Sequence, residues 1–447
     1  MEKSLNRTVG IYTLGCKVNQ YESEAISELL EANGISTVPL PAFCDAYIIN
    51  TCTVTAESDR KARQFIRRAI SKSPSAYIIV TGCLAQTAPE DIAKINGVDF
   101  ICGNSSKLTV AEKLIEYFNK NKPKSSPEIF VNDINTASFE KMSIKKFERT
   151  RAYVKIEDGC ENRCAYCIIP SARGKIRSKA PDDVISEVKA LVENGCKEIV
   201  LTGIETASYG KDIKDISLAD LLCRIDKING IERIRLGSLD PSLITPEFIS
   251  KISCLKSLAP HFHLSLQSGS SRVLALMRRK YNADMAMRAI ELLRASIPHV
   301  CFSTDVIVGF PQETQEDFDD TVAFIEKAQF LTVHIFPYSS RKGTEASKMS
   351  GQISQDEKHR RLHVLKESAH ASRLNVLRAE LQSDKTKQVL FETYDGKYAY
   401  GHTDNFLEVA VMSDCDLKSK ILRVSLESTD GNLCFGSIIT TDPKEEK

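Results

Sequence analysis

The chain lacks a long apolar run, a strong net charge, and any histidine beside its most closely spaced cysteines. In its 447 residues, no uninterrupted apolar stretch approaches the roughly 20 residues that a membrane-spanning helix needs. Residues 1–7 contain no apolar core of a signal peptide, so we expect a cytoplasmic protein with no membrane partner. The net charge of +1 excludes no class of partner, but any nucleic-acid site must then depend on local basic patches.

Fourteen cysteines are present, which in a cytoplasmic chain favours metal ligation over disulfides. Cys160, Cys164 and Cys167 have the spacing C-x3-C-x2-C directly after a predicted strand. Three thiolates can each hold one iron of a four-iron, four-sulfur cluster. The missing fourth cysteine leaves one iron open for chemistry, by analogy with open catalytic zinc sites. A structural zinc site is the alternative, but zinc usually takes four Cys or His ligands, and residues 150–180 contain no histidine.

The chain is too long for one core, and its patterns predict three folded parts. Residues 1–122 alternate strands with helices, and we expect Asn19, with Glu22 three residues later, to cap the first helix. The alternation predicts an α/β domain with a doubly wound parallel sheet, and residues 123–149 resemble a linker. Residues 150–378 hold six strand–helix units and predict a partial (β/α)6 barrel with a trailing helix, whereas 379–447 predict a small all-β barrel. The expected strands are 9–14, 46–50 and 76–81, then 152–157, 197–202, 233–239, 261–267, 302–308 and 331–336, then 388–391, 406–412, 421–426 and 435–440.

A second group of three cysteines, Cys16, Cys52 and Cys83, follows the three predicted N-terminal strands. The carboxyl ends of parallel strands converge on one crevice, and Gly15 and Gly82 would allow a close backbone approach there. The long separations leave open that two of the three are core cysteines, but the repeated context leads us to interpret them as a second three-thiol site. We expect the remaining eight to be small buried hydrophobes: Cys44, Cys102, Cys196, Cys223, Cys254, Cys301, Cys415 and Cys434.

Together these motifs resemble those of the radical S-adenosylmethionine (SAM) methylthiotransferases. The opening run 13–23 is similar to that of members that act on N6-threonylcarbamoyladenosine in tRNA. Lys17-Val18 favours this subgroup, since members acting on isopentenyl adenosine tend to carry Gln-Met there and members acting on a ribosomal-protein aspartate tend to carry Pro-Lys. Gln312 departs from the pattern, because relatives commonly have Gly before Glu313. The other matching runs are 50–55, 158–160, 201–203, 263–269, 305–311 and 336–339.

The resemblance implies two [4Fe-4S] clusters and SAM as cofactors. One cluster would bind SAM and cleave it to a deoxyadenosyl radical, and the other would hold the sulfur to be transferred. The ligands carried over are Cys160, Cys164 and Cys167 for the first cluster and Cys16, Cys52 and Cys83 for the second.

The resemblance also implies contacts to SAM. Tyr166 would contact the adenine, and Gly203 and Glu205 would bind the amino group, although Glu205 could also be an ordinary acid on a solvated loop. Three residues near later strand ends would hydrogen-bond SAM or fill the barrel interior: Ser238, Ser265 and Gln267.

The implied reaction adds a methylthio group to carbon 2 of N6-threonylcarbamoyladenosine next to the tRNA anticodon. Methylthiolation of isopentenyl adenosine in tRNA, or of a ribosomal-protein aspartate, stays open, as does an RNA-binding protein with structural metal. The C-terminal module resembles the RNA-contacting TRAM domain, but its net charge is negative. We expect the anticodon stem-loop and an electron donor such as flavodoxin or ferredoxin as partners, and a monomer.

Phosphate contacts need basic residues near the active face. The basic candidates are Arg60, Lys61, Arg63, Arg67 and Arg68; Arg173, Lys175, Arg177 and Lys179; and Arg278, Arg279 and Lys280. In the C-terminal module, Lys397, Tyr398, Tyr400 and His402 would contact RNA, with the aromatic rings stacked on unpaired bases, or would be ordinary strand residues.

Overall fold

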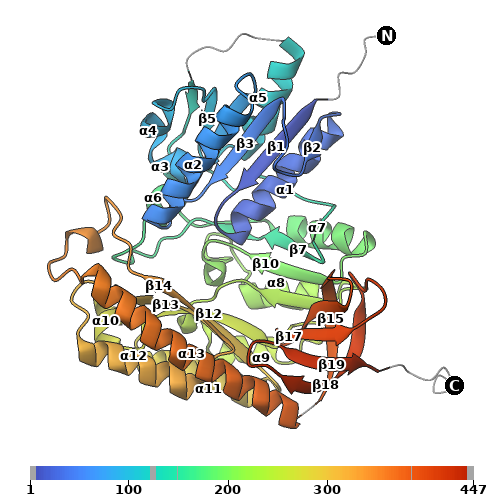
Figure 1. Ribbon diagram of the computed structural model, residues 1–447, viewed down its shortest axis with the longest axis vertical. Helices are drawn as coiled ribbons and strands as arrows, with labels where there is room; N and C mark the ends of the chain where they lie inside the picture. The colour runs from blue at the N-terminus through green and yellow to red at the C-terminus, as the bar shows by residue number, and fades with distance from the viewer. Residues whose placement is uncertain (1–6, 121–126, 148, 384, 440–447) are drawn as a thin grey trace.

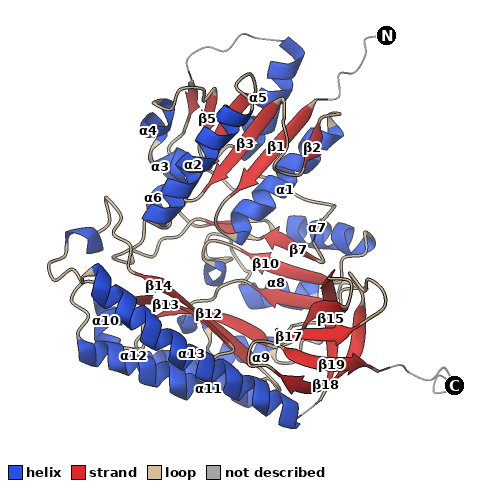
Figure 2. Cartoon of the chain, viewed as in Figure 1, coloured by secondary structure: helices blue, strands red, loops and turns tan. Residues whose placement is uncertain are grey.

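A parallel sheet of six strands forms the N-terminal part of the protein (Figures 1 and 2). The computed structural model describes residues 7–120, 127–147, 149–383 and 385–439. In order across the sheet, the strands are β2 (Ser36–Val38), β1 (Thr8–Thr13), β3 (Ala46–Thr51), β4 (Tyr77–Gly82), β5 (Phe100–Cys102) and β6 (Glu128–Phe130). The helices are α1 (Lys17–Ala32), α2 (Ala56–Lys72), α3 (Cys83–Thr87), α4 (Pro89–Ala93) and α5 (Lys107–Lys120).

Alternate residues of β3 show why helices cover both faces of this sheet. All six residues of the strand are buried. Ile48 belongs to the core that includes residues of α1 and α5, and Ile49 belongs to a separate core that includes residues of α2 and α4. Successive side chains of a strand point to opposite faces, so a strand buried throughout lies inside a two-sided parallel sheet. The predicted doubly wound domain is confirmed.

Helix α1 begins at Lys17, before the capping residue expected at Asn19. Cys16 occupies the N-cap position without a side-chain hydrogen bond. Asn19 is buried, and its amide donates to the carbonyl oxygens of Leu14 (2.7 Å) and Thr51 (3.0 Å). The prediction of Asn19 as a cap is therefore wrong. An asparagine side chain can cap a helix, but it can also hydrogen-bond the backbone of two strand ends, as it does here.

The segment predicted as a linker, 123–149, carries structure in its described part. Strand β6 lies there and pairs in parallel with β5, which adds a sixth strand to the sheet. Further along, the Ile144 amide donates to the Glu187 carboxylate at 2.7 Å. A strand of three residues gives too little periodicity to be recognised in a sequence.

Six parallel strands form the central part, as two sheets of three (Figure 1). A parallel bridge between Leu239 and Leu264 joins the two sheets, so the predicted partial (β/α)6 barrel is confirmed. The strands are β7 (Arg151–Lys155), β10 (Glu198–Thr202), β11 (Arg233–Leu236), β12 (His261–Gln267), β13 (Cys301–Val308) and β14 (Thr332–Pro337). The longer helices around them are α7 (Pro181–Glu193), α8 (Leu218–Ile225), α9 (Pro246–Ile252), α10 (Ser271–Leu276), α11 (Ala283–Ser296) and α12 (Gln315–Ala328).

A long helix, α13 (Gln355–Ser383), leads into a closed C-terminal barrel, as predicted. Around the barrel the strands are β15 (Thr386–Tyr394), β16 (Tyr398–Thr403), β17 (Glu408–Met412), β19 (Cys434–Ile438) and β18 (Ile421–Thr429). The sequence prediction missed β16, which contains Gly401. A Cβ at Gly401 would lie 2.2 Å from the Leu390 carbonyl oxygen, so the close approach of β15 to β16 requires glycine at this position. Glycine is uncommon in strands, and it therefore weakened the sequence pattern that would have predicted β16. Within the described ranges, no helix has both the length and the apolar character needed to cross a bilayer.

The C-terminal barrel covers the amino ends of the central strands. The Phe406 ring stacks on His261 with centroids 4.7 Å apart, and the Arg235 guanidinium lies 4.6 Å from the same ring. Arg233 donates to the Gln388 carbonyl at 2.7 Å. These contacts leave the carboxyl ends of the strands as the open face of the central barrel.

Gln312, the departure from the family pattern, has a φ of +67°, in the left-handed region that glycine favours. Gln312→Gly is expected to raise the free energy of unfolding by about 1 kcal/mol, because the strain relieved exceeds the extra chain entropy of glycine. Urea unfolding of the two proteins measures the difference. An unchanged or lower midpoint for Gln312→Gly would contradict this account of the turn.

Candidate functional site

The loop 160–167 follows β7 and the short strand β8 (Glu157–Asp158) at the carboxyl ends of the barrel strands. Its backbone is fixed at several points. The Cys160 amide donates to the Gly174 carbonyl at 2.9 Å, and the Ala165 amide donates to the Met277 carbonyl at 3.0 Å. The three cysteines of the loop are free and half-buried. The structure therefore places three thiols on one fixed loop at the open face of the barrel.

The charges around these thiols suit a cationic ligand. Burial, with smaller contributions from Glu205 and the two neighbouring thiols, raises the pKa of Cys160 to about 12. Burial, together with Cys164, also raises the pKa of Cys167 to about 12, against the lowering effect of Arg279. Thiols that raise one another's pKa lie within electrostatic range of each other. A bound soft metal removes this penalty by stabilising the thiolates, so the donor set fits an iron–sulfur cluster.

The other three cysteines also come together. Cys16, Cys52 and Cys83 lie at or just beyond the carboxyl ends of β1, β3 and β4, which are neighbours in the sheet. Gly15 has a φ of +95°, and a Cβ there would lie 2.8 Å from the Cys52 sulfur. Burial, followed by the charges of Cys83 and Cys16, raises the pKa of Cys52 to about 12. Because Gly15 has no side chain, the backbone after β1 can approach the Cys52 sulfur closely. The three thiols can then lie near enough together to hold one cluster.

The two cysteine sets lie on elements that touch. Helix α3 begins at Cys83 and packs against α6 (Ile169–Arg173), which begins two residues after Cys167. The Asn104 amide joins them, since it donates to the Cys83 sulfur (3.6 Å) and to the Ala172 carbonyl (2.8 Å). The elements that carry the two cysteine sets therefore pack against each other.

A buried ionic network underlies this junction. Arg173 has no exposed surface and donates to Glu22 Oε1 at 2.6 Å and to Asp158 Oδ2 at 3.2 Å. Lys155 also contacts both carboxylates, and Lys107 contacts Glu22. Burial raises the pKa of Glu22, but Arg173, Lys107 and Lys155 outweigh it and hold that pKa well below its usual value. The network ties α1 of the N-terminal domain to β7, β8 and α6 of the barrel.

These partners overturn part of the predicted RNA surface. Arg173, Arg177 and Lys179 are buried and paired with Glu22, Asp158 or Glu187, so they are not phosphate contacts. Of that predicted patch, Lys175 alone is exposed. The predicted patch of Arg278, Arg279 and Lys280 is only partly exposed as well, because the Arg279 side chain is buried.

A small cavity of about 170 Å³ lies beside the cysteine loop and is lined in part by Asn162, Glu205 and Asp240. The Asn162 amide donates to Glu205 Oε2 at 3.1 Å. Burial and the neighbouring Asp240 charge raise the pKa of Glu205 to about 7, against the lowering effect of Arg279. Gly203, at the end of β10, leaves room for the Glu157 carboxyl, since a Cβ there would lie 2.6 Å from Oε2. An acidic cavity next to the loop fits a cationic ligand group.

The other predicted SAM residues lie at the same face. Tyr166, which lies between Cys164 and Cys167 in the sequence, is half-buried and packs against a group of apolar side chains that includes Phe310. Ser238 is exposed just beyond β11. Ser265 and Gln267 are half-buried on β12, and Gln267 has a strained φ of +70°. The structure brings these residues to the open face, and their contacts with SAM stay predictions.

Glu157 and Asn104 are site residues that the sequence did not reveal, and Arg279 was predicted only as a phosphate contact. Arg279 Nη1 lies 3.3 Å from the Cys164 sulfur, and Nη2 donates to Asp240 at 2.8 Å. Glu157 accepts the Glu205 amide at 2.8 Å, and burial raises its pKa well above the usual value. In the sequence, the one feature that pointed to any of them is the position of Glu157, at a strand end three residues before Cys160.

Comparisons with known proteins agree with this geometry. The family described as the Radical SAM superfamily matches residues 154–325, and the uncharacterized protein family UPF0004 matches residues 8–103. Threonylcarbamoyladenosine tRNA methylthiotransferase MtaB of Bacillus subtilis (strain 168) is 40% identical over 425 residues, which cover 94% of this chain and 93% of that protein.

The chain belongs to the radical SAM methylthiotransferase family. This membership confirms the predicted enzyme class and cofactors, SAM and two [4Fe-4S] clusters, and sets aside an RNA-binding protein with structural metal alone. A tRNA-2-methylthio-N(6)-dimethylallyladenosine synthase of Clostridium novyi (strain NT) is 33% identical over 97% of both chains. The radical SAM methyltransferase TsrM of Kitasatospora setae shares the fold of this methylthiotransferase, with a TM-score of 0.57 and 14% identity over 76% of this chain and 77% of that one.

Proposed function

We propose that this enzyme adds a methylthio group to carbon 2 of N6-threonylcarbamoyladenosine beside the tRNA anticodon. The observation that carries the proposal is the contact of α3, which begins at Cys83, with α6, which begins two residues after Cys167, because it supports two three-thiol sites that act together. The similarity to the methylthiotransferase of Bacillus subtilis supports this substrate. The predicted electron donor, monomeric state and cytoplasmic location stay predictions.

When bound, the cofactors supply a methyl group, a sulfur atom and a deoxyadenosyl radical. The net change replaces the hydrogen at carbon 2 with a methylthio group, and that hydrogen leaves on deoxyadenosine. One SAM would give the methyl group and leave as S-adenosylhomocysteine. The other would be cleaved, with an electron from the predicted donor, to methionine and the deoxyadenosyl radical.

The chain's own residues hold and position these groups. Cys160, Cys164 and Cys167 would hold the cluster that binds SAM, and Arg279 would balance the negative charge of their sulfurs. The second cluster would be held by Cys16, Cys52 and Cys83.

Helix α2 offers the strongest surface for the RNA backbone. It starts four residues after Cys52, and its basic residues Arg60, Lys61, Arg67 and Arg68 are exposed. Of these, Arg60 is paired with Glu57 on the same helix. The exposed side chain of Val54, 52% accessible, lies between the cysteine and the helix. Phosphates bound to α2 would bring the anticodon loop to the second thiol site.

A reaction with purified components tests the substrate. The reconstituted enzyme, SAM and a reductant are incubated with tRNA that carries either N6-threonylcarbamoyladenosine or isopentenyl adenosine, and the nucleosides are analysed by mass spectrometry. We expect the methylthio product from the first tRNA. Product from the isopentenyl tRNA instead, or from neither tRNA but from ribosomal protein, would reject the assignment in favour of those alternatives.

Glu205→Gln is expected to weaken SAM binding about tenfold at pH 8, because the amide cannot form a charge-assisted bond to the ammonium group. Since the pKa of Glu205 is about 7, its carboxyl ionises as the pH rises, so the wild type should bind SAM more tightly from about pH 6 to 8. The variant should lose that dependence. Anaerobic equilibrium dialysis measures both.

Glu193→Gln, at an exposed position on α7, is the matched control and should bind SAM as the wild type does. If Glu205→Gln also keeps wild-type affinity at pH 8, Glu205 is not the ammonium partner.

A further inference from the structure

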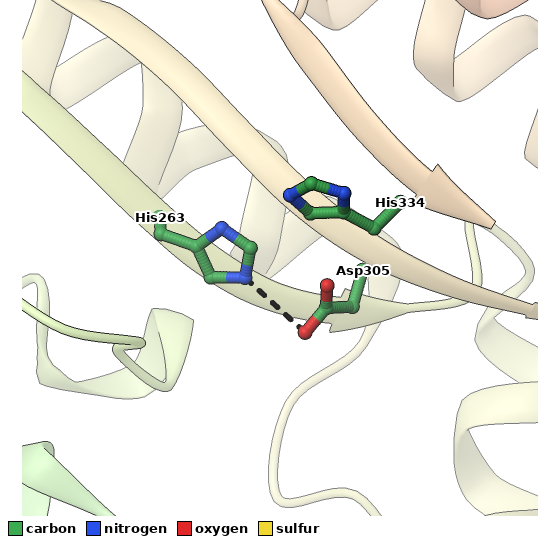
Figure 3. A group of neighbouring side chains, drawn as sticks. All are labelled: His263, Asp305 and His334. Atoms are coloured by element: carbon green, nitrogen blue, oxygen red, sulfur yellow. Dashed lines mark ion pairs between the residues drawn. The ribbon is translucent and has the colours of Figure 1, made fainter. Parts of the chain in front are cut away.

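Three side chains meet on the inner face of the barrel, as Figure 3 shows. His263 on β12, Asp305 on β13 and His334 on β14 each place one polar atom within 4.8 Å of the others. His263 Nε2 lies 3.2 Å from Asp305 Oδ2, and its Nδ1 lies 2.9 Å from Ser303 Oγ. None of the three is fully buried, so the group stays accessible to a ligand.

Lys17 approaches the same group from the N-terminal domain. It follows Cys16 directly. Its charge interacts most strongly with Arg235 and Arg151, then with Asp305, and it also acts on His334 and His261. Lys17 is solvent-accessible, and within the described part of the chain its side chain makes no hydrogen bond or ion pair. We call Lys17, His263, Asp305 and His334 the lumen cluster. The Lys17 ammonium group is the one cation of this cluster, and in the described residues it has no hydrogen-bonded or ion-paired partner.

The chemistry of the lumen cluster favours an anion over a metal ion. Two histidines and one aspartate are a common metal-ligand set. Here, however, Asp305 is already paired with His263, and the Lys17 ammonium repels a second cation. An unpaired ammonium beside imidazole groups and a carboxylate suits an organic anion that also carries hydroxyl or N–H groups.

We propose that the lumen cluster binds the amino-acid end of the substrate's N6 group, with the Lys17 ammonium paired to its carboxylate. This assignment rests on the proposed function. The threonyl hydroxyl and the carbamoyl N–H groups match the acceptor oxygens of Asp305 and the ring nitrogens of His334. A dimethylallyl group has no polar atom for these partners and would desolvate Lys17 without compensation, so the cluster also selects against it.

Equilibrium binding of anticodon stem-loop RNAs tests the assignment. The full-length, cluster-reconstituted protein is titrated into fluorescent RNAs that carry N6-threonylcarbamoyladenosine, the same nucleoside with its carboxylate converted to a neutral amide, or adenosine. The wild type should bind the acid about tenfold more tightly than the amide. Lys17→Gln should bind both equally, with the affinity that the wild type shows for the amide.

Two further variants keep the test independent of cluster assembly. Lys189→Gln removes an exposed lysine on α7 and should keep the full preference for the acid. His334→Ala, far from the cysteines in the sequence, should keep full iron content and lose part of the preference.

An unchanged preference in Lys17→Gln with full iron content would overturn the assignment, as would an additional metal ion that is present in the wild type and lost in His334→Ala. If the wild type methylthiolates threonylcarbamoyladenosine while Lys17→Gln and His334→Ala keep the full preference for the acid, this assignment fails alone. If the wild type does not form that product, the proposed function fails first.

Discussion

Cys164→Ala is expected to abolish SAM cleavage and to lower the iron content from about eight to about four atoms per chain. Two remaining thiols on the loop cannot hold a cluster that needs three, whereas the second thiol set lies on different strands and keeps its ligands. Iron analysis after anaerobic reconstitution measures the first effect, and the yield of deoxyadenosine under reducing conditions measures the second.

Cys254→Ala is the matched control for this prediction. Cys254 lies outside both groups and is free and exposed, so the expectation that it is buried is wrong. Its replacement should leave iron content and SAM cleavage at wild-type levels. Full iron content in Cys164→Ala, or SAM cleavage by that variant, would show that the loop cysteines do not act as one ligand set.

Arg173→Met is expected to lower the free energy of unfolding by about 3–5 kcal/mol, because it leaves Glu22 and Asp158 buried without their main partner. The first transition in urea measures the loss. Because the cations hold the pKa of Glu22 well below its usual value, the network stabilises the protein above the usual pKa of Glu, and this contribution is lost as the pH falls. The deficit of the variant should therefore shrink below about pH 4.

Arg278→Ala provides the comparison. Arg278 is 55% exposed and pairs with Glu345, which is 48% exposed, so its removal should cost less than about 1 kcal/mol. Equal effects of the two substitutions would mean that the buried network does not hold the N-terminal domain against the barrel.

Regular alternation made most of the fold predictable from the sequence. The strands of the central barrel lie close to their predicted positions because each is a short apolar run bounded by turns. The three-residue strands β2, β5 and β6 and the glycine-containing β16 carry little of that signal and were missed. Asn19 was misassigned because its partners, the carbonyls of Leu14 and Thr51, are set by tertiary structure.

The site was predictable where its residues are close in sequence or repeat a strand-end context. The loop cysteines meet the first condition, and Cys16, Cys52 and Cys83 meet the second. Arg279 lies 115 residues from Cys164, so nothing local distinguishes it from the exposed Arg278 beside it. Arg173 was predicted to face RNA for the same reason, since a basic residue's burial depends on distant acids such as Glu22.

Nucleoside mass spectrometry of bulk tRNA tests the central claim most directly. The gene is deleted, in cells without a paralogue, and restored as the wild type or as Cys52→Ala. The account predicts that the methylthio form of threonylcarbamoyladenosine disappears on deletion, returns with the wild type and stays absent with Cys52→Ala. Persistence of that nucleoside in the deletion strain, or its return with Cys52→Ala, would contradict it.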